Sequence, residues 1–178
     1  VLVTTKKAKK GATSVSYDGM VGVRNATNLP KPLNAQQEIE MRKRSFANAG
    51  LPLPDGWNVE KNPWIATTRT NWMDEVFRTA FYQRHNVAIS TGTDTFTNRL
   101  SFAYDNDEGI MRYTFNKNLA LHYTGKYQIN KWVYISEDFV WKNTESRTTA
   151  TNEGYTGPIL SAIYMPASAT VYSPFTKS

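Results

Sequence analysis

Histidine and cysteine, the residues most often found in catalytic and metal sites, are scarce in this chain of 178 residues. There is no cysteine, which excludes a thiolate zinc site, a disulfide and a cysteine nucleophile. The two histidines, His85 and His122, are far apart, and neither has a second ligand at helix or strand spacing. A Ser-His-Asp triad would need one of these histidines beside a serine, and nothing in the sequence distinguishes one serine from the others. The sequence therefore predicts no enzyme, no metal and no cofactor, and it gives His122 a hydrogen-bonding role.

A short acidic run, Asp105, Asp107 and Glu108, is the other group of potential metal ligands. A calcium loop of EF-hand spacing needs glycine at its sixth position and glutamate at its twelfth. Ile110 and Asn116 occupy those positions. We therefore expect an acidic surface loop and no calcium site.

Basic residues exceed acidic ones, giving a formal net charge of +6. Much of the excess lies in Lys6, Lys7, Lys9 and Lys10. A basic cluster can bind nucleic acid, but no nucleic-acid-binding motif accompanies this one. We expect a solvated turn between two strands and no nucleic-acid partner.

Aromatic residues in the long, turn-rich segments are the candidates for substrate binding. Exposed rings can stack on sugar faces, but aromatic side chains also line barrel interfaces and pin loops together. Both roles stay open for these four residues: Trp57, Trp64, Trp72 and Tyr155.

The elements that would position these residues are mainly strands. Apolar residues recur at every second position in five segments, which predicts half-buried β-strands at 13–24, 84–92, 98–105, 112–125 and 131–143. One helix is predicted over 35–48, because Asn34 and Gln37 form a capping box and Gly50 follows its end. A short helical turn is expected over 71–77. The prediction is an all-β protein with a short helix in one loop.

The connections between the strands are unequal, short at one end and long at the other, as in outer-membrane barrels. The strands also match the ~9–11 residues that cross a bilayer at a tilt. One face carries Asn, Ser, Thr and His and suits a wet lumen, whereas the other would contact lipid. A soluble β-sandwich carbohydrate-binding module is the alternative, since its strands alternate too. The predicted lipid-facing residues are Leu100, Phe102, Tyr104, Phe115, Leu119, Leu121, Val133, Ile135 and Phe139.

Two charged residues interrupt this apolar face, Lys117 and Glu137. An isolated lysine at the middle of a bilayer costs about 2–4 kcal/mol. If the intervening turn centres near Tyr127 or Gln128, the two residues are cross-strand neighbours and attract. We expect an ion pair or a contact with a partner protein; a local register shift that turns both inward is the alternative.

Several stretches resemble the SusC/RagA family of TonB-linked outer-membrane proteins, in order along nearly the whole chain. The match departs from the family where Ile110 and Met111 alone join Gly109 to Arg112, since this loop is usually longer, and where Phe81 replaces a common proline. The matching stretches are Leu2-Val3-Thr4-Thr5-Lys6-Lys7, Thr13-Ser14-Val15-Ser16-Tyr17-Asp18-Gly19, Leu33-Asn34-Ala35-Gln36, Trp72-Met73-Asp74-Glu75-Val76-Phe77-Arg78-Thr79-Ala80 with His85-Asn86-Val87, and Asn152-Glu153-Gly154 with Gly157-Pro158-Ile159 and Tyr164-Met165-Pro166.

The resemblance implies a plugged transmembrane antiparallel β-barrel of about 22 strands, of which this chain supplies a fragment. Residues 1–12 would end the plug domain, and residues 13–178 would form the first barrel strands and loops. The implied function is TonB-dependent import of oligosaccharide or peptide across the outer membrane of a Gram-negative, Bacteroidetes-like cell. The implied partners are a SusD-like surface lipoprotein, outer-membrane lipid, and the TonB complex through a missing N-terminal part.

Overall fold

The computed structural model describes residues 11–149 and 157–172. The chain divides into two compact units. We call residues 11–25 and 79–148 the sheet unit, and residues 26–78, 149 and 157–172 the loop unit. Each unit has its own architecture and is described by itself.

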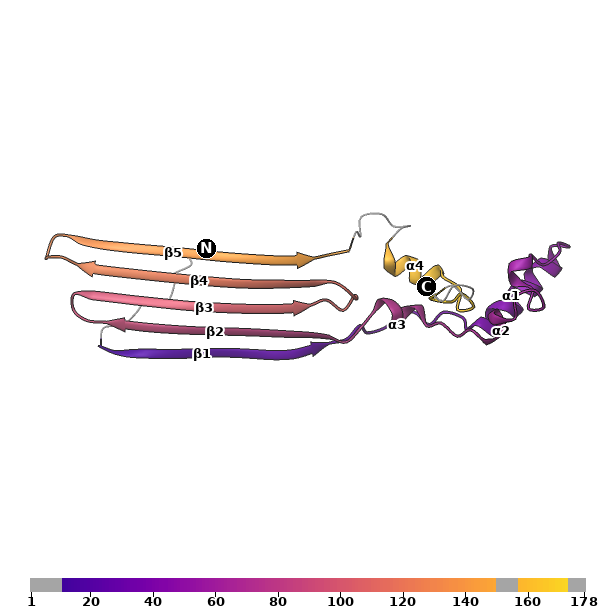
Figure 1. The fold of residues 1–178 in the computed structure, drawn as a ribbon, viewed down its shortest axis with the longest axis horizontal. Helices are drawn as coiled ribbons and strands as arrows, with labels where there is room; N and C mark the ends of the chain where they lie inside the picture. The colour runs from indigo at the N-terminus through magenta and orange to yellow at the C-terminus, as the bar shows by residue number, and fades with distance from the viewer. Residues whose placement is uncertain (1–10, 150–156, 173–178) are drawn as a thin grey trace. The chain divides into compact units, whose positions relative to one another are not determined.

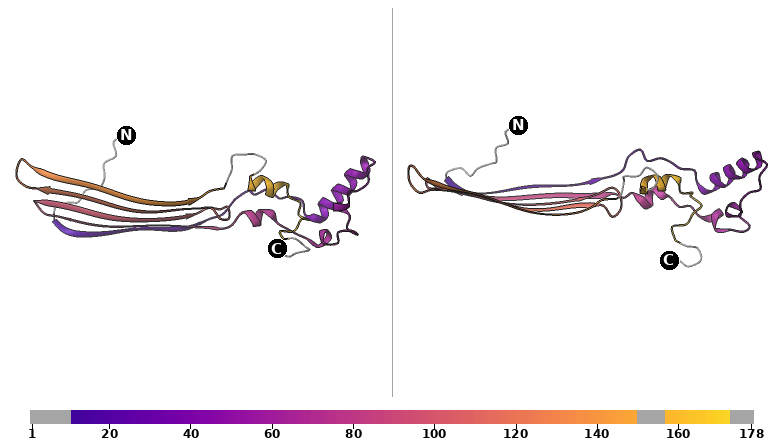
Figure 2. Two further views of the ribbon diagram at one scale, coloured as in Figure 1. Left: turned by 45° about the horizontal axis from the view of Figure 1, so that its top comes forward. Right: turned by 90° about the horizontal axis from the view of Figure 1, so that it is seen from above.

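The sheet unit consists of five antiparallel strands that pair in chain order, β1 with β2 and so on to β5 (Figure 1). Viewed from the side, they form one curved and twisted layer (Figure 2). This consecutive order is the simplest that short hairpin turns allow. The strands are β1 (Gly11–Arg24), β2 (Ala80–Gly92), β3 (Phe96–Glu108), β4 (Phe115–Gln128) and β5 (Tyr134–Arg147).

Two short turns lie at one end of the sheet, because successive strands run in opposite directions. The β2–β3 turn is closed by a hydrogen bond from the Thr93 amide to the Phe96 carbonyl, at 2.6 Å. The β4–β5 turn spans residues 129–133, where the Asn130 side chain accepts from the amides of Trp132 and Val133. We call this the turn end and the opposite one the loop end.

All five predicted strands are present, and three of them, β2, β3 and β5, extend further toward the loop end than predicted, whereas β4 begins later, at Phe115. Val133 is a specific error, because it was placed on the apolar face of the last strand. It precedes β5, and its carbonyl accepts from the amides of Ile129 and Asn130, so it belongs to the turn.

The expected pairing of Lys117 with Glu137 is also wrong. The turn centres on residue 131, which places Lys117 opposite Glu145 and Glu137 opposite Gly125. The two expected partners are eight residues apart along the ladder, or about 27 Å at ~3.4 Å per residue. The turn was expected a few residues too early, and this error shifted every pair in the hairpin.

The loop unit is built from short helices. These are α1 (Ala35–Asn48), η1 (Asp55–Trp57), α2 (Trp64–Thr67), α3 (Trp72–Val76) and α4 (Pro158–Tyr164). The predicted bounds of α1 are confirmed: the Asn34 and Gln37 side chains each bond the other residue's backbone amide. The helical turn near 71–77 is confirmed as α3, whereas α2 and α4 are too short to show apolar periodicity and were not predicted. Within the described ranges, no helix has the length and apolar character needed to cross a membrane.

Few residues are buried, and those of the sheet are small. Ala80, Ala88 and Gly92 are the buried residues of the sheet, and no large side chain in the described ranges is fully enclosed. Every residue of β5 is exposed. A single layer of strands cannot bury both of its faces, so the sheet needs other material on each side.

Cross-linking tests the β4–β5 register. With other cysteines replaced, the complete protein carrying Lys117→Cys and Glu145→Cys should oxidise to a disulfide, because directly opposed residues have Cβ atoms ~5 Å apart. The matched pair Lys117→Cys with Glu137→Cys should stay reduced. A disulfide in the second pair and not in the first would place the turn near residue 127, as the sequence suggested.

Candidate functional site

The register aligns alternate residues of the five strands into rows that cross the sheet. On one face, which we call the apolar face, two successive rows consist almost wholly of apolar and aromatic residues. Each row is named here by its residue in β4. The Tyr123 row contains Val15, Ile89, Leu100, Tyr123 and Phe139, and the Leu121 row contains Tyr17, Val87, Phe102, Leu121 and Trp141.

Polar rows bound this apolar region at both ends. Toward the loop end a mixed Leu119 row is followed by a Lys117 row; toward the turn end lies a Gly125 row. The Leu119 row is Gly19, His85, Tyr104, Leu119 and Asn143; the Lys117 row is Val21, Gln83, Asn106, Lys117 and Glu145; the Gly125 row is Thr91, Asn98, Gly125 and Glu137.

The residues predicted to face lipid do share one face, apart from Val133. The register places these eight on the apolar face: Leu100, Phe102, Tyr104, Phe115, Leu119, Leu121, Ile135 and Phe139. The alternation was sufficient to predict the common face because it is a local property of each strand. Contact of this face with lipid remains a prediction.

The opposite face is polar and carries cross-strand pairs. His122 Nε2 lies 2.9 Å from Asp138 Oδ1, which confirms its hydrogen-bonding role. Thr144 donates to the Asn118 side chain at 2.8 Å. We call this the polar face.

The acidic residues expected in a surface loop lie instead at the end of β3. Asp105 pairs with Arg84 and Asp107 with Arg24, both at 2.5 Å and on the polar face. Both pairs are partly exposed, so each contributes at most about 1 kcal/mol. Alternation turns Glu108 to the apolar face. In residues 11–149 and 157–172, no three His, Cys, Asp or Glu side chains gather where they could hold a metal.

Within the loop unit, the segment around residues 166–169 is held against residues 70–72. Trp72 donates its indole Nε1–H to the Pro166 carbonyl at 2.9 Å. The Thr70 amide donates to the Ala167 carbonyl at 3.1 Å, and the Thr70 hydroxyl donates to the Ala169 carbonyl at 2.7 Å. These three bonds join two segments that are far apart in sequence, and sequence reasoning had no signal for them.

A buried carboxyl group lies at the same junction. Glu38, on α1, is only 8% exposed. Burial raises the pKa of Glu38 above its usual value, while the Arg42 charge and the Ala167 backbone hydrogen bond act in the opposite direction. Glu38 therefore joins α1 to the 166–169 segment, and the loss of water around its carboxyl group disfavours the charged form.

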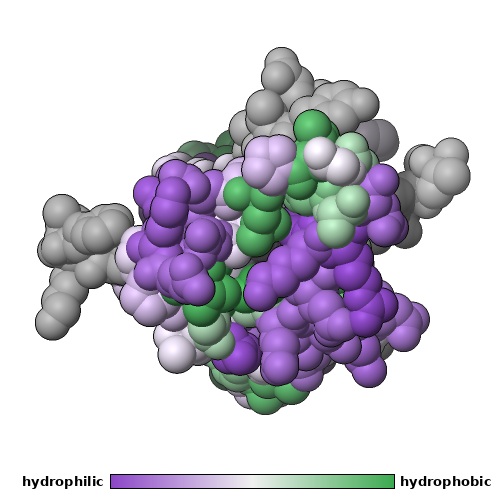
Figure 3. Space-filling model, turned by 90° about the vertical axis from the view of Figure 1, so that its right-hand side faces the viewer, coloured by the Kyte–Doolittle hydropathy of each residue, from purple (hydrophilic) through white to green (hydrophobic). Residues whose placement is uncertain are grey.

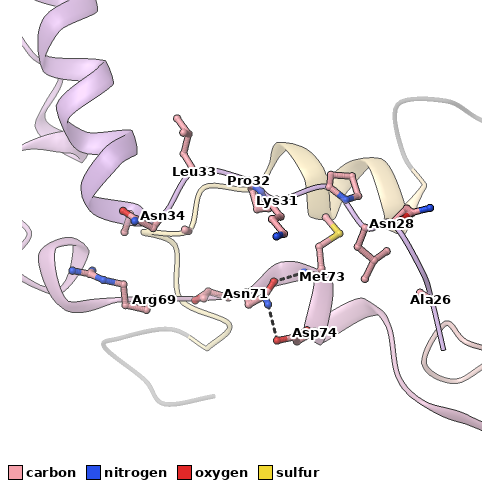
Figure 4. A pocket seen from close by; sticks show the side chains of 15 residues that line it. Ala26, Asn28, Lys31, Pro32, Leu33, Asn34, Arg69, Asn71, Met73 and Asp74 are labelled. Carbon is pink, nitrogen blue, oxygen red and sulfur yellow. Dashed lines mark hydrogen bonds between the residues drawn. The ribbon is translucent and has the colours of Figure 1, made fainter.

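A cavity of about 620 Å³ lies between residues 26–35 and residues 69–74. Figure 4 shows Asn71 joined to Met73 and Asp74, with Lys31 and Pro32 on the opposite wall. Arg69 donates to the Ala66 and Thr68 carbonyls, so several of the polar groups at the cavity already have partners within the loop unit.

Seen from the side drawn in Figure 3, the surface is mostly hydrophilic, with smaller hydrophobic areas between.

Three of the aromatic substrate-binding candidates, Trp57, Trp64 and Trp72, do not line this cavity. The Trp72 indole holds the 166–169 segment, and the Trp57 ring stacks under the Arg42 guanidinium at 5.1 Å. Trp64 is half-buried at the start of α2, and Tyr155 falls outside the described residues. The contacts of Trp72 and Trp57 support the structural role; substrate binding by any of the four remains a prediction.

Comparisons with known proteins identify one relative and a common fold. The TonB-dependent receptor SusC of Bacteroides thetaiotaomicron is 32% identical over 127 residues, 67% of this chain and 12% of SusC. The chain's fold matches the RagAB peptide transporter with a TM-score of 0.64 at 16% identity, covering 81% of this chain and 19% of that one. The RagAB peptide importer in its "open-open" state gives 0.60 at 14% identity, covering 80% and 19%. No protein-family model matches.

Removing the indole donor tests the role of Trp72. Trp72→Phe should weaken the docking of residues 166–169 by about 1 kcal/mol, the usual contribution of one hydrogen bond. Amides in that segment should then exchange with deuterium roughly 5-fold faster. Trp57→Phe is the matched control, since it makes the same exchange of an indole for a phenyl ring at a residue that contacts Arg42, and it should leave the exchange rate unchanged. Equal exchange in the two variants would contradict the assigned role.

The buried carboxyl group predicts a pH dependence of the same docking. Because the folded pKa of Glu38 is raised, its contribution is fully present below the unfolded pKa and is lost as pH rises through the folded pKa. Hydrogen exchange at Thr70 and Ala167, corrected for the intrinsic rate, should therefore show looser docking at neutral than at acidic pH. Glu38→Gln should remove this difference; a difference that persists in the variant would assign it to another group.

Proposed function

We propose that this chain, which belongs to the SusC/RagA family of TonB-dependent outer-membrane transporters, forms five consecutive strands and two long outer loops of an importer's β-barrel. The observation that carries the proposal is a sheet with one apolar face, one polar face and no large buried side chain of its own. Such a sheet is stable where lipid covers one face and a wet, plug-filled lumen covers the other.

The sheet edges support a larger barrel. Among the described residues, β1 and β5 each pair with one neighbouring strand, so no described strand pairs with the backbone groups of their outer edges. In hydrocarbon each unpaired group costs several kcal/mol, and only closure into a barrel removes both edges. The chain spans 12% of SusC and 19% of the solved RagAB chains, so the remaining strands would come from other parts of the complete protein.

The connections give the orientation. Outer-membrane barrels have short periplasmic turns and longer extracellular loops. We therefore assign the turn end of the sheet to the periplasm and the loop end, with the loop unit, to the cell exterior. The segment that precedes β1 would then link this strand to a plug domain on the periplasmic side.

Cargo and partners follow from the relatives. The similar solved structures are described as a peptide transporter and importer, and SusC as a TonB-dependent receptor. We propose uptake of a peptide or an oligosaccharide, energised by TonB and assisted by a SusD-like lipoprotein that contacts the loop unit. No catalytic role is proposed, since the relatives are a receptor and transporters.

The alternative function, a soluble carbohydrate-binding sandwich, has less support. A β-sandwich needs two sheets packed face to face about 10 Å apart. The strands of the described residues form one sheet. In such a module the side chains on one face of β5 would be buried against the second sheet, whereas every residue of β5 is exposed.

Uptake by the complete protein tests this proposal. The full polypeptide, produced with its neighbouring lipoprotein in a strain lacking other importers, should be extracted from outer membranes by detergent. The cells should take up labelled peptides or oligosaccharides, and inactivation of TonB should abolish uptake while leaving the protein level unchanged. A water-soluble product of the size of this chain, or uptake that persists without TonB, would refute the proposal.

A further inference from the structure

Two tyrosines on the apolar face share an unusual arrangement. In each, a glycine follows the tyrosine two residues later, and the ring lies along the strand over that glycine. In β1 the Tyr17 ring covers Gly19; in β4 a Cβ on Gly125 would be only 2.7 Å from the Tyr123 hydroxyl. Any larger residue at either position would displace the ring.

Each tyrosine hydroxyl also forms a hydrogen bond to a polar residue of the neighbouring strand. This polar residue is the one directly opposite the glycine. Gly19 pairs with His85, and the Tyr17 hydroxyl lies 2.7 Å from His85 Nδ1. Gly125 pairs with Asn98, and the Tyr123 hydroxyl donates to Asn98 Oδ1 at 3.2 Å. The tyrosine caps a polar side chain that would otherwise face outward from an apolar surface.

The two caps point away from the centre of the apolar face. The Tyr17 ring runs from the Leu121 row to the Leu119 row, toward the loop end. The Tyr123 ring runs from the Tyr123 row to the Gly125 row, toward the turn end. Lys117 behaves in the same way: its Nζ lies 4.9 Å from the centre of the Phe115 ring, which is closer to the loop end. Long amphipathic side chains near a membrane border direct their polar tips outward in this manner.

Aromatic residues lie beyond the polar rows on both sides, as expected for interfacial girdles. Past the Lys117 row are Phe81 and Phe115. Past the Gly125 row are Phe96 and Tyr127, followed by Trp132 in the turn, which is 90% exposed. The tyrosine caps and the aromatic girdles thus lie on both sides of the Leu121 row, and Lys117 lies on the side of the loop end.

We propose that the middle of the hydrocarbon layer crosses the sheet at the Leu121 row, and that Tyr17 and Tyr123 cap His85 and Asn98 within that layer, one on each side of the middle. The inference rests on the proposed function and adds the depth at which the barrel sits. The apolar face contacts the acyl chains of the lipid. The Tyr17 hydroxyl points toward the outer leaflet and the Tyr123 hydroxyl toward the inner leaflet.

The width of the apolar face explains the need for the caps. From the Lys117 row to the Gly125 row is eight residues, about 27 Å along strands and about 20 Å in height at a tilt of ~40°. If His85 were uncapped, the apolar region would end one row earlier, leaving about 15 Å of height by the same arithmetic. The apolar band of an outer-membrane barrel is about 25 Å tall, so the uncapped surface would be much too narrow.

Depth measurements test the position of the membrane. In the complete transporter, single cysteines at Lys117, Leu119, Leu121, Phe139 and Glu137, one in each of the five rows, would carry a fluorophore in phosphatidylcholine vesicles that contain doxyl-labelled acyl chains. Quenching by deep doxyl groups should be greatest at Leu121 and decline toward both ends. Labels at Ala120 and His122, on the polar face, are controls and should not be quenched by lipid. A maximum at either end would overturn the inference, whereas no lipid quenching at any position would overturn the proposed function.

Hydroxyl removal tests the caps. Tyr17→Phe should lower the urea midpoint of the transporter in vesicles, because His85 then faces hydrocarbon without its partner. The double variant Tyr17→Phe with His85→Phe should recover most of the loss, since neither polar group remains. Tyr104→Phe, on the same face and in the row of His85, is the control and should match the parent protein. A Tyr17→Phe midpoint equal to that of Tyr104→Phe would overturn the role of the cap.

Discussion

Backbone pairing between consecutive strands determines where every side chain of the sheet lies. Once Tyr17 pairs with Val87 and Val87 with Phe102, the alternation of side chains brings one residue from each strand into a common row. A shift of one residue in any hairpin would interrupt the apolar rows with polar residues. The apolar surface, the ion pairs of the polar face and the tyrosine caps all depend on this single register.

The loop unit is stabilised differently. Its helices are short, few of its described residues are buried, and its segments are joined by individual hydrogen bonds and not by a large apolar core. Trp72 and Thr70 bond carbonyls of residues 166–169, and Glu38 is buried beside them. Because each bond contributes only about 1 kcal/mol, the arrangement can respond to a single protonation or to a partner's contact.

Local patterns in the sequence predicted local features well. Alternation identified the five strands and their faces, and the Asn34 capping box gave the bounds of α1. Features that depend on distant partners were missed. Val133 was assigned to a strand because it is apolar, although Asn130 caps a turn there. The acidic run was assigned to a loop because its partners, Arg24 and Arg84, lie on other strands. The cavity and the 166–169 contacts likewise involve residues far apart in the chain.

The bonds between residues 70–72 and 166–169 also affect how such loops can be exchanged among relatives. The donors come from one long segment and the acceptors from the other. Replacement of only one segment by that of a relative would change the distances between these donors and acceptors. The two segments are therefore one structural unit, and both would have to be exchanged together to keep the three hydrogen bonds.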